Sequence, residues 1–184
     1  MATVDALITA DDYFDAAAGV REPTQLIDGV IVPSQPKPRH QQVTLRIARC
    51  LLEWTEGPGF GLAGIPIDVI VDRYNVYAPD VWWVAEASRV DPDEYFRGVP
   101  DLAVEVRSPS TWHYDVGVKR TRYEQHGLPE LWLVDTSDRS VLVARRSAPR
   151  VRGFDLEVKV TADEVLTSPL LPGFELRLAD VLAG

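Results

Sequence analysis

Apolar side chains recur at a helical spacing in one long segment, from about Arg39 to Glu53. The shared stripe consists of Val43, Ile47, Leu51 and Trp54. Such a stripe is typical of an amphipathic helix that packs one face on a core. Two shorter helices are also predicted, one that Thr9 caps and that runs through Ala18 to a stop at Gly19, and one from about Asp115 to His126.

Short apolar runs between polar turns predict strands over most of the remaining chain. The first two form a hairpin over residues 26–32, because the Asp28-Gly29 pair favours a two-residue β-turn. Further strands are predicted at residues 61–65, 67–71, 78–85, 102–107, 131–134, 141–145 and 154–160. Residues 168–174 are predicted to form a turn before a short final segment.

The order of the elements is helix, strands, helix, strands, helix, strands. This order indicates an α/β fold with a mixed central β-sheet flanked by helices. Residues 1–184 are expected to form one domain, because the chain is long enough for one core and rather short for two.

Composition narrows the class of protein. The single cysteine, Cys50, excludes a disulfide framework and a cysteine-rich zinc site. The first fifteen residues carry several acids and no long apolar core, so no signal peptide is expected. No apolar run approaches the ~18 residues that a membrane helix needs. These features predict a cytoplasmic protein with no membrane segment.

The formal net charge of −9 bears on nucleic-acid binding. Proteins that grip phosphates usually present Lys and Arg, which displace counterions. Net charge describes the whole surface, however, and a cleft can be locally basic. The charge therefore disfavours tight non-specific DNA binding, but it does not exclude a nuclease, whose catalytic carboxylates add negative charge.

A carboxylate within an apolar strand is the first chemical signal. Glu105 lies in the run 102–107, where its burial is costly unless a cation or hydrogen bonds compensate it. Asp101 shares its strand face, but four residues at ~3.3 Å each separate the two by roughly 13 Å, too far for one ion. Asp80, which follows Pro79 on a different strand, would lie beside Glu105 if the two strands are neighbours.

Two carboxylates, a main-chain carbonyl and waters suit a hard ion such as Mg²⁺. Such an ion would lower the pKa of a bound water and stabilise charge on a phosphoryl oxygen. A nearby cation would hold the nucleophile or the developing phosphorane charge. Arg107 shares the face of Glu105, but a guanidinium is a poor proton shuttle. Lys119, on the next predicted helix, is the alternative cation.

Recognisable motifs cover nearly the whole chain, and the longest block runs from Pro100 to Asp135. The motifs are residues 25–29, 38–41, 77–81, 100–111, 127–135 and 168–173, and Asp115, Lys119 and Tyr123 between the blocks 100–111 and 127–135 belong to the same pattern. In these motifs the chain closely resembles the Uma-two family of putative restriction endonucleases, which belongs to the PD-(D/E)XK nuclease superfamily.

The resemblance implies a restriction-endonuclease-like core and a metal-dependent endonuclease that acts on DNA. Carried over by position, Asp80 and Glu105 would hold Mg²⁺ or Mn²⁺. The usual lysine two places after the acid is replaced by Arg107, which would assist electrostatically, and Lys119 would be the displaced lysine. A homodimer is expected by analogy, since a duplex has two strands to cut.

The chain departs from the family pattern at one position. The family segment usually reads Glu-Leu-Ile-Asp-Gly, and this chain has Gln25 in place of the glutamate. A neutral amide would weaken the site if that acid binds metal or orients water. The alternative function is therefore a catalytically weak or inactive nuclease-fold module that binds nucleic acid or a protein partner.

Each candidate residue also has a simpler interpretation. Glu105 could pair with a basic residue for structural reasons, and Asp80 could accept hydrogen bonds at the start of a strand. Lys119 could form a surface ion pair with Asp115, four residues earlier on the same helix. His40, near the start of a helix, is more often a capping or packing residue than a ligand.

Overall fold

The structure is a computed structural model that describes residues 7–17, 23–57 and 59–183. The helices are α1 (Ala10–Ala17), α2 (Pro38–Thr55), α3 (Trp112–Tyr114), α4 (Arg120–Gln125) and α5 (Leu178–Val181), with a 3-10 turn η1 (Ala87–Arg89) and a π-helical turn η2 (Asp115–Lys119). The strands are β1 (Thr24–Ile27), β2 (Val30–Pro33), β3 (Leu62–Gly64), β4 (Val69–Asp72), β5 (Asn75–Tyr77), β6 (Val81–Val84), β7 (Phe96–Arg97), β8 (Leu102–Val106), β9 (Glu130–Asp135), β10 (Ser140–Arg145), β11 (Leu156–Thr161), β12 (Val165–Ser168) and β13 (Leu171–Arg177).

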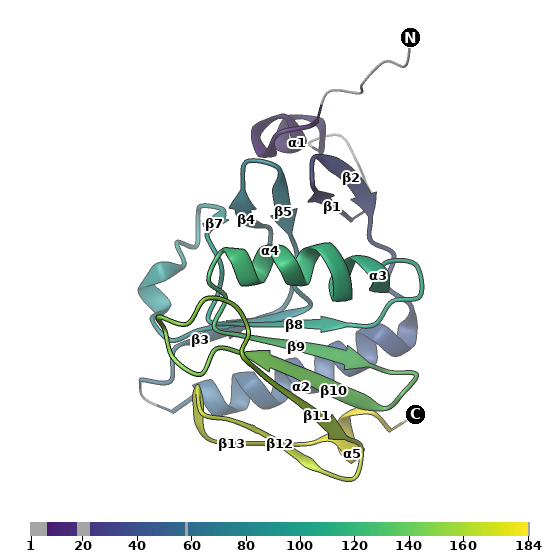
Figure 1. The fold of residues 1–184 in the computed structure, drawn as a ribbon, viewed down its shortest axis with the longest axis vertical. Helices are drawn as coiled ribbons and strands as arrows, with labels where there is room; N and C mark the ends of the chain where they lie inside the picture. Colours follow the sequence, from purple (N-terminus) through teal and green to yellow (C-terminus); the bar gives the residue numbers. More distant parts are fainter. Residues whose placement is uncertain (1–6, 18–22, 58, 184) are drawn as a thin grey trace.

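In the described part of the chain the strands form two main sheets and a hairpin. The larger sheet has the order β11-β10-β9-β8-β6-β3, the smaller has the order β2-β1-β5-β4-β7, and β12 pairs with β13. Strand β8 runs parallel to β9 and antiparallel to β6, so the predicted mixed sheet is confirmed. In Figure 1 the smaller sheet and α1 lie at one end of the molecule and the β12–β13 hairpin lies at the other.

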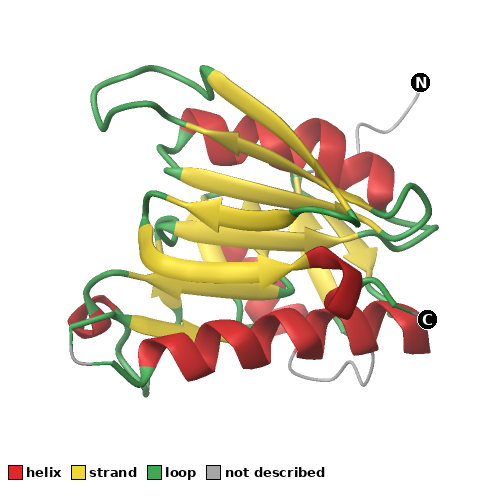
Figure 2. Cartoon of the chain, turned by 90° about the horizontal axis from the view of Figure 1, so that it is seen from below, coloured by secondary structure: helices red, strands yellow, loops and turns green. Residues whose placement is uncertain are grey.

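Helices cover both faces of the larger sheet (Figure 2). The predicted stripe of α2 packs on one face, where Ile47 and Leu51 join the same buried cluster as Val104 of β8. On the other face, Tyr123 of α4 is buried against Ala103 of the same strand. Strand β8 is thus enclosed on both sides, which is why its sequence is apolar at nearly every position.

Local signals in the sequence account for one hairpin turn and for the start of one helix. Asp28 and Gly29 both have positive φ, at 47° and 75°, as the predicted two-residue hairpin turn requires. At the start of α1, the Thr9 hydroxyl accepts a hydrogen bond from the backbone N–H of Asp12, and the Asp12 carboxylate accepts one from the Thr9 hydroxyl. The predicted end of this helix, at Ala18 and Gly19, lies outside the described residues.

The structure differs from the sequence prediction in three respects. Strands β5 and β7 are only three and two residues long, too short to give a periodic signal. The tail, predicted to be a turn, forms the β12–β13 hairpin with an irregular register. The helix predicted from Asp115 begins earlier, at Trp112, and contains the π-helical turn η2.

Within the described residues, no helix is both long and apolar enough to cross a membrane.

The adjacent Trp82 and Trp83 are both buried, on opposite faces of the larger sheet. Each indole N–H donates to a backbone carbonyl of the β3 region, Trp82 to Ile65 and Trp83 to Phe60, at 2.7 Å in both cases. These bonds hold the edge strand β3 against β6.

The loop before β3 provides a test of this close packing. A Cβ atom added to Gly61 would lie 2.0 Å from the Val84 carbonyl oxygen, whereas one added to Gly59 would meet nothing within 4 Å. Both glycines have positive φ, so alanine at either should cost about 1–2 kcal/mol in backbone strain. We expect Gly61→Ala to lower the free energy of unfolding, measured with urea, by at least about 1 kcal/mol more than Gly59→Ala. Equal losses would contradict the packing described here.

Candidate active site

The register of β6 and β8 brings two of the sequence candidates together. Val81 is paired with Val104 in this antiparallel pair, so the next residues outward, Asp80 and Glu105, are also neighbours. The Asp80 side chain is fixed to strand β8 next to Glu105, because its Oδ2 atom accepts a 2.7 Å hydrogen bond from the backbone N–H of Val106. The prediction that Asp80 lies beside Glu105 is therefore confirmed in geometry.

Glu105 is compensated by side chains from the helix that covers this face. The Lys119 Nζ atom lies 2.8 Å from Glu105 Oε1 and 2.9 Å from Asp115 Oδ1. The Tyr123 hydroxyl donates a 2.9 Å hydrogen bond to the same Glu105 oxygen. We call Glu105, Asp115, Lys119 and Tyr123 the acid–lysine cluster.

The cluster is buried throughout. Lys119 is 1% exposed and Glu105 is 3% exposed, and Asp115 and Tyr123 are buried as well. The ion pair between Asp115 and Lys119 therefore forms as the sequence spacing suggested, but the interpretation that it lies on the surface is wrong. A lysine enclosed in this way needs its carboxylate partners, because an unpaired ammonium is very costly to bury.

Helix geometry aims these side chains at the sheet. Asp115 and Lys119 are the ends of the π-helical turn η2, and Tyr123 follows one turn later in α4. The Tyr77 ring closes the cluster, with the Lys119 ammonium 5.5 Å from the ring centroid and the Tyr123 ring in an edge-on contact at 5.3 Å. Single π-helical turns inside helices are frequent at functional sites.

The cluster holds two carboxylates but one cation. Burial raises the pKa of Glu105 to about 8, although Lys119 opposes the shift, and burial likewise raises the pKa of Asp115. Burial alone would lower the pKa of Lys119, but Asp115 and Glu105 outweigh it and raise this pKa. Lys119 is therefore an ammonium at neutral pH, and the surplus negative charge favours retention of a proton by the carboxylates.

Asp80 has a second partner on α2. The His40 Nε2 atom lies 3.1 Å from Asp80 Oδ2, so His40 contacts the site rather than serving only to cap or pack its helix. Both residues line a groove of about 320 Å³ between the first turns of α2 and the loop after β3. His40 thus joins the candidate site, for which the sequence interpretation favoured a capping or packing role.

Two other sequence candidates lie in different surroundings. Arg107 pairs with Asp135 at 2.7 Å, and its guanidinium lies 5.8 Å from the Trp112 ring centroid. These contacts direct its charge to Asp135 and Trp112 and not to Glu105. Its assisting role stays a prediction. Asp101 forms a 2.7 Å ion pair with Arg89, away from Glu105.

The carboxylates of Asp80 and Glu105 form a candidate site for a metal ion. Among the described residues, no three or more His, Cys, Asp or Glu side chains are grouped to hold an ion. The hydrogen bonds from Val106 and His40 reach Asp80 at Oδ2, and that from Tyr123 reaches Glu105 at Oε1, so the second oxygen of each carboxylate is the one that could ligate an ion. Two carboxylate oxygens completed by waters fit Mg²⁺, which usually retains several waters.

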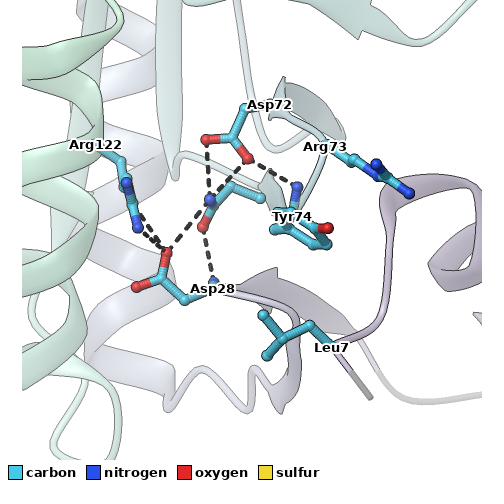
Figure 3. Close-up of a pocket in the computed structure, with 7 residues that line it drawn as sticks. Leu7, Asp28, Asp72, Arg73, Tyr74 and Arg122 are labelled. Carbon is cyan, nitrogen blue, oxygen red and sulfur yellow. Dashed lines mark hydrogen bonds and ion pairs between the residues drawn. The ribbon is translucent and has the colours of Figure 1, made fainter.

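A second polar network fixes α4 to the smaller sheet (Figure 3). Arg122 pairs with Asp28 at 2.8 Å, and the Asn75 amide donates to Asp72 at 2.9 Å. The Tyr77 hydroxyl donates to Asn75 at 2.8 Å, which links the network to the acid–lysine cluster. Asp28, Asp72, Asn75 and Arg122 line a pocket of about 420 Å³, but their contacts with one another identify them as supports for the helix that carries Lys119.

The sequence interpretation missed Asp115, Tyr123 and Tyr77 as site residues. Asp115, Lys119 and Tyr123 recur every four residues, and this polar stripe on a helix over an apolar sheet is the signal that could have identified two of them. No comparable signal marks Tyr77, which lies in the short strand β5.

Comparison with known proteins identifies the family and the fold. The family model Uma2, described as a putative restriction endonuclease, matches residues 10–179. The chain is similar in structure to a putative nuclease of the DUF820 family from Anabaena variabilis ATCC 29413, with a TM-score of 0.75 and 18% sequence identity. That match covers 96% of this chain and 98% of the Anabaena chain, so the restriction-endonuclease-like fold is confirmed. No curated protein matches the chain.

The charge imbalance of the cluster predicts a large loss of stability when the cation is removed and a small one when a carboxylate is neutralised. Lys119→Met leaves two buried carboxylates without a cation and should lower the free energy of unfolding by about 3–5 kcal/mol. Glu105→Gln keeps an acceptor for the Tyr123 hydroxyl and leaves Lys119 paired with Asp115, so its cost should be less than about 1 kcal/mol. Urea unfolding at pH 7 measures both effects.

The pH dependence of the same two proteins checks the cause. Because the pKa of folded Glu105 is raised, the folded state binds more protons than the unfolded state, and wild-type stability falls as pH rises from about 4.5 to about 8. Glu105→Gln removes this contribution. Its stability relative to wild type should therefore rise across that window, and a constant difference would show that Glu105 is ionised throughout.

Proposed function

The chain belongs to the Uma2 family of putative restriction endonucleases, and from this premise we propose that it is a metal-dependent endonuclease that hydrolyses DNA phosphodiester bonds. The observation that carries the proposal is the pairing of Asp80 with Glu105 beside a buried lysine. Structural ion pairs rarely combine a fully buried lysine with two carboxylates of raised pKa, whereas active sites often do.

In this proposal Asp80 and Glu105 would hold Mg²⁺ or Mn²⁺ through their carboxylate oxygens. When bound, the ion would lower the pKa of a coordinated water and polarise the scissile phosphoryl group. The hydrogen bonds that Asp80 accepts from Val106 and His40 would keep its second oxygen oriented toward the ion. Such supporting contacts to ligating carboxylates are usual in metal sites.

The proposed role of Lys119 is electrostatic. Its raised pKa keeps it protonated, so it is suited to stabilise negative charge on the attacking water or the phosphorane and not to remove a proton. Asp115 would then act as a positioning residue. It pairs with the Lys119 ammonium at 2.9 Å, and this ammonium lies 2.8 Å from Glu105. Water adds to phosphorus, one P–O ester bond breaks, and the leaving oxygen takes up a proton.

Gln25 lies next to this site. Its side-chain Oε1 atom accepts a 3.1 Å hydrogen bond from the backbone N–H of Ala78, two residues before Asp80. A glutamate at this position could accept the same bond and direct its second oxygen to the ion, whereas the second polar atom of the amide is an N–H₂ donor. The substitution thus supports a weaker metal site than one with a third carboxylate.

The proposal predicts metal-dependent cleavage that requires Glu105. Purified protein with Mn²⁺ should nick supercoiled plasmid, and Glu105→Gln, which preserves the packing of the cluster, should lower the rate by at least about 100-fold because it removes a ligand. Asp101→Asn is the matched control, since Asp101 lies at the other end of β8 and pairs with Arg89. Equal nicking by the wild type and Glu105→Gln would sink the proposed site.

A second expectation concerns the departure at Gln25. Gln25→Glu should tighten Mn²⁺ binding, measured by isothermal titration, by about 10-fold, because it adds an acidic ligand without altering the bond to Ala78. Gln42→Glu adds the same charge on the exposed face of α2 and serves as its control. If the wild type neither binds metal nor nicks DNA while Gln25→Glu does both, the chain is an inactive descendant that functions as a binding module.

A further inference from the structure

The groove beside Asp80 has a chemistry unlike that of a surface for duplex DNA. Its volume is about 320 Å³, and its apolar rim is formed by Pro36, Leu45, Ile65 and Pro66. Leu45 and Ile65 are 59% and 52% exposed, so two large aliphatic side chains face solvent at its edge. Neither Lys nor Arg lines the groove, so a phosphate backbone would find no counter-charge within it.

Two polar atoms at the same groove have no hydrogen-bond partner among the described residues. They are His40 Nδ1 and Thr44 Oγ1, and both are shielded from bulk water. Thr44 is only 7% exposed, so its hydroxyl is a buried polar group without compensation. A buried donor or acceptor of this kind favours a ligand that supplies the missing bond.

The groove begins at the first turn of α2. That helix has no side-chain cap, no acidic residue in its first turn, and Pro38 at its start. Lys37 and Arg39 are exposed on either side of this proline. A helix N-terminus flanked by two cations suits a single phosphate, placed beside an apolar groove that suits a planar ring.

We propose that this groove binds the base and sugar of one unpaired nucleotide next to Asp80, so that the preferred substrate is single-stranded DNA. This inference rests on the proposed function and names its substrate class. An unpaired base exposes both its ring faces and its hydrogen-bonding edge, which match the apolar rim and the groups of His40 and Thr44. A base stacked in a duplex presents neither face.

The overall charge of −9 agrees with this choice. Duplex binding depends largely on neutralised phosphates, which an acidic protein provides poorly. Burial of an unpaired base against apolar side chains depends less on net charge. A strongly acidic nuclease can therefore hold a single strand through one buried base and a few phosphate contacts.

Binding of fluorescent oligonucleotides in EDTA tests the groove without cleavage. A 20-nucleotide single strand should bind about tenfold more tightly than the matching duplex. Leu45→Glu should weaken single-strand binding by about tenfold, the equivalent of one lost base contact. Leu52→Glu, on the same helix and outside the groove, adds the same charge at a residue that is 43% exposed and should leave binding unchanged.

A neutral variant separates the groove from simple charge repulsion. Thr44→Val preserves shape but removes the hydroxyl, and it should weaken single-strand binding by roughly threefold or more. Circular dichroism confirms that each variant is folded. Duplex binding that equals or exceeds single-strand binding, or wild-type single-strand binding by both Leu45→Glu and Thr44→Val, would overturn the inference.

The two proposals can fail separately. Glu105-dependent nicking together with wild-type binding by the groove variants would discard the groove and leave the hydrolysis standing. Single-strand binding that depends on Leu45 and Thr44, without Glu105-dependent cleavage, would discard the hydrolysis and keep the groove as the site of a single-strand-binding module.

Discussion

The enclosure of one lysine between two carboxylates is the interaction on which the site depends. Lys119 can occupy the interior only because Glu105 and Asp115 lie within 3 Å of its ammonium, and the two acids can be buried only because the ammonium is there. This mutual dependence couples the helix that carries Lys119 to strand β8. Burial raises the pKa of both carboxyl groups, and the two carboxylates carry one negative charge more than the single ammonium neutralises. The site therefore has an affinity for a proton or a cation.

The rest of the fold holds that enclosure in place. The antiparallel register of β6 and β8 brings Asp80 to Glu105, and the bond from Val106 fixes the Asp80 carboxylate. The smaller sheet acts from the other side, since Asp28 anchors Arg122 of α4 and Tyr77 closes the cluster. The two sheets thus form a frame in which each candidate side chain has a supporting contact of its own, as a rigid catalytic constellation requires.

The acidity of the protein also acquires a structural meaning. Part of the negative charge belongs to carboxylates that are buried and paired, and these do not repel a substrate as exposed charges do. The groove beside Asp80 has an apolar rim, and Lys37 and Arg39 are exposed at the start of α2. Recognition by burial of a base and a short phosphate contact is therefore physically consistent with a net charge that disfavours wrapping of a duplex.

The sequence by itself determined the elements that depend on local chemistry. The stripe of α2, the Asp28-Gly29 turn and the Thr9 cap are specified within a few residues, and the structure contains each of them. The apolar run around Glu105 also marked that residue as a carboxylate in need of compensation, the predicted neighbouring strand and helix suggested Asp80 and Lys119 beside it, and the family motifs implied their roles. Short pairing strands such as β5 gave no signal, because their pairing partners, and not their own periodicity, define them.

Only the tertiary structure decided which groups meet. Spacing on the helix allowed an ion pair between Asp115 and Lys119 but could not show that it is buried, since burial depends on the sheet beneath it. Strand alternation placed Arg107 on the face of Glu105, yet Asp135 from the neighbouring strand is its partner. The contact between His40 and Asp80 joins residues forty positions apart. Such contacts follow from sheet register and helix packing, which no local stretch of sequence contains.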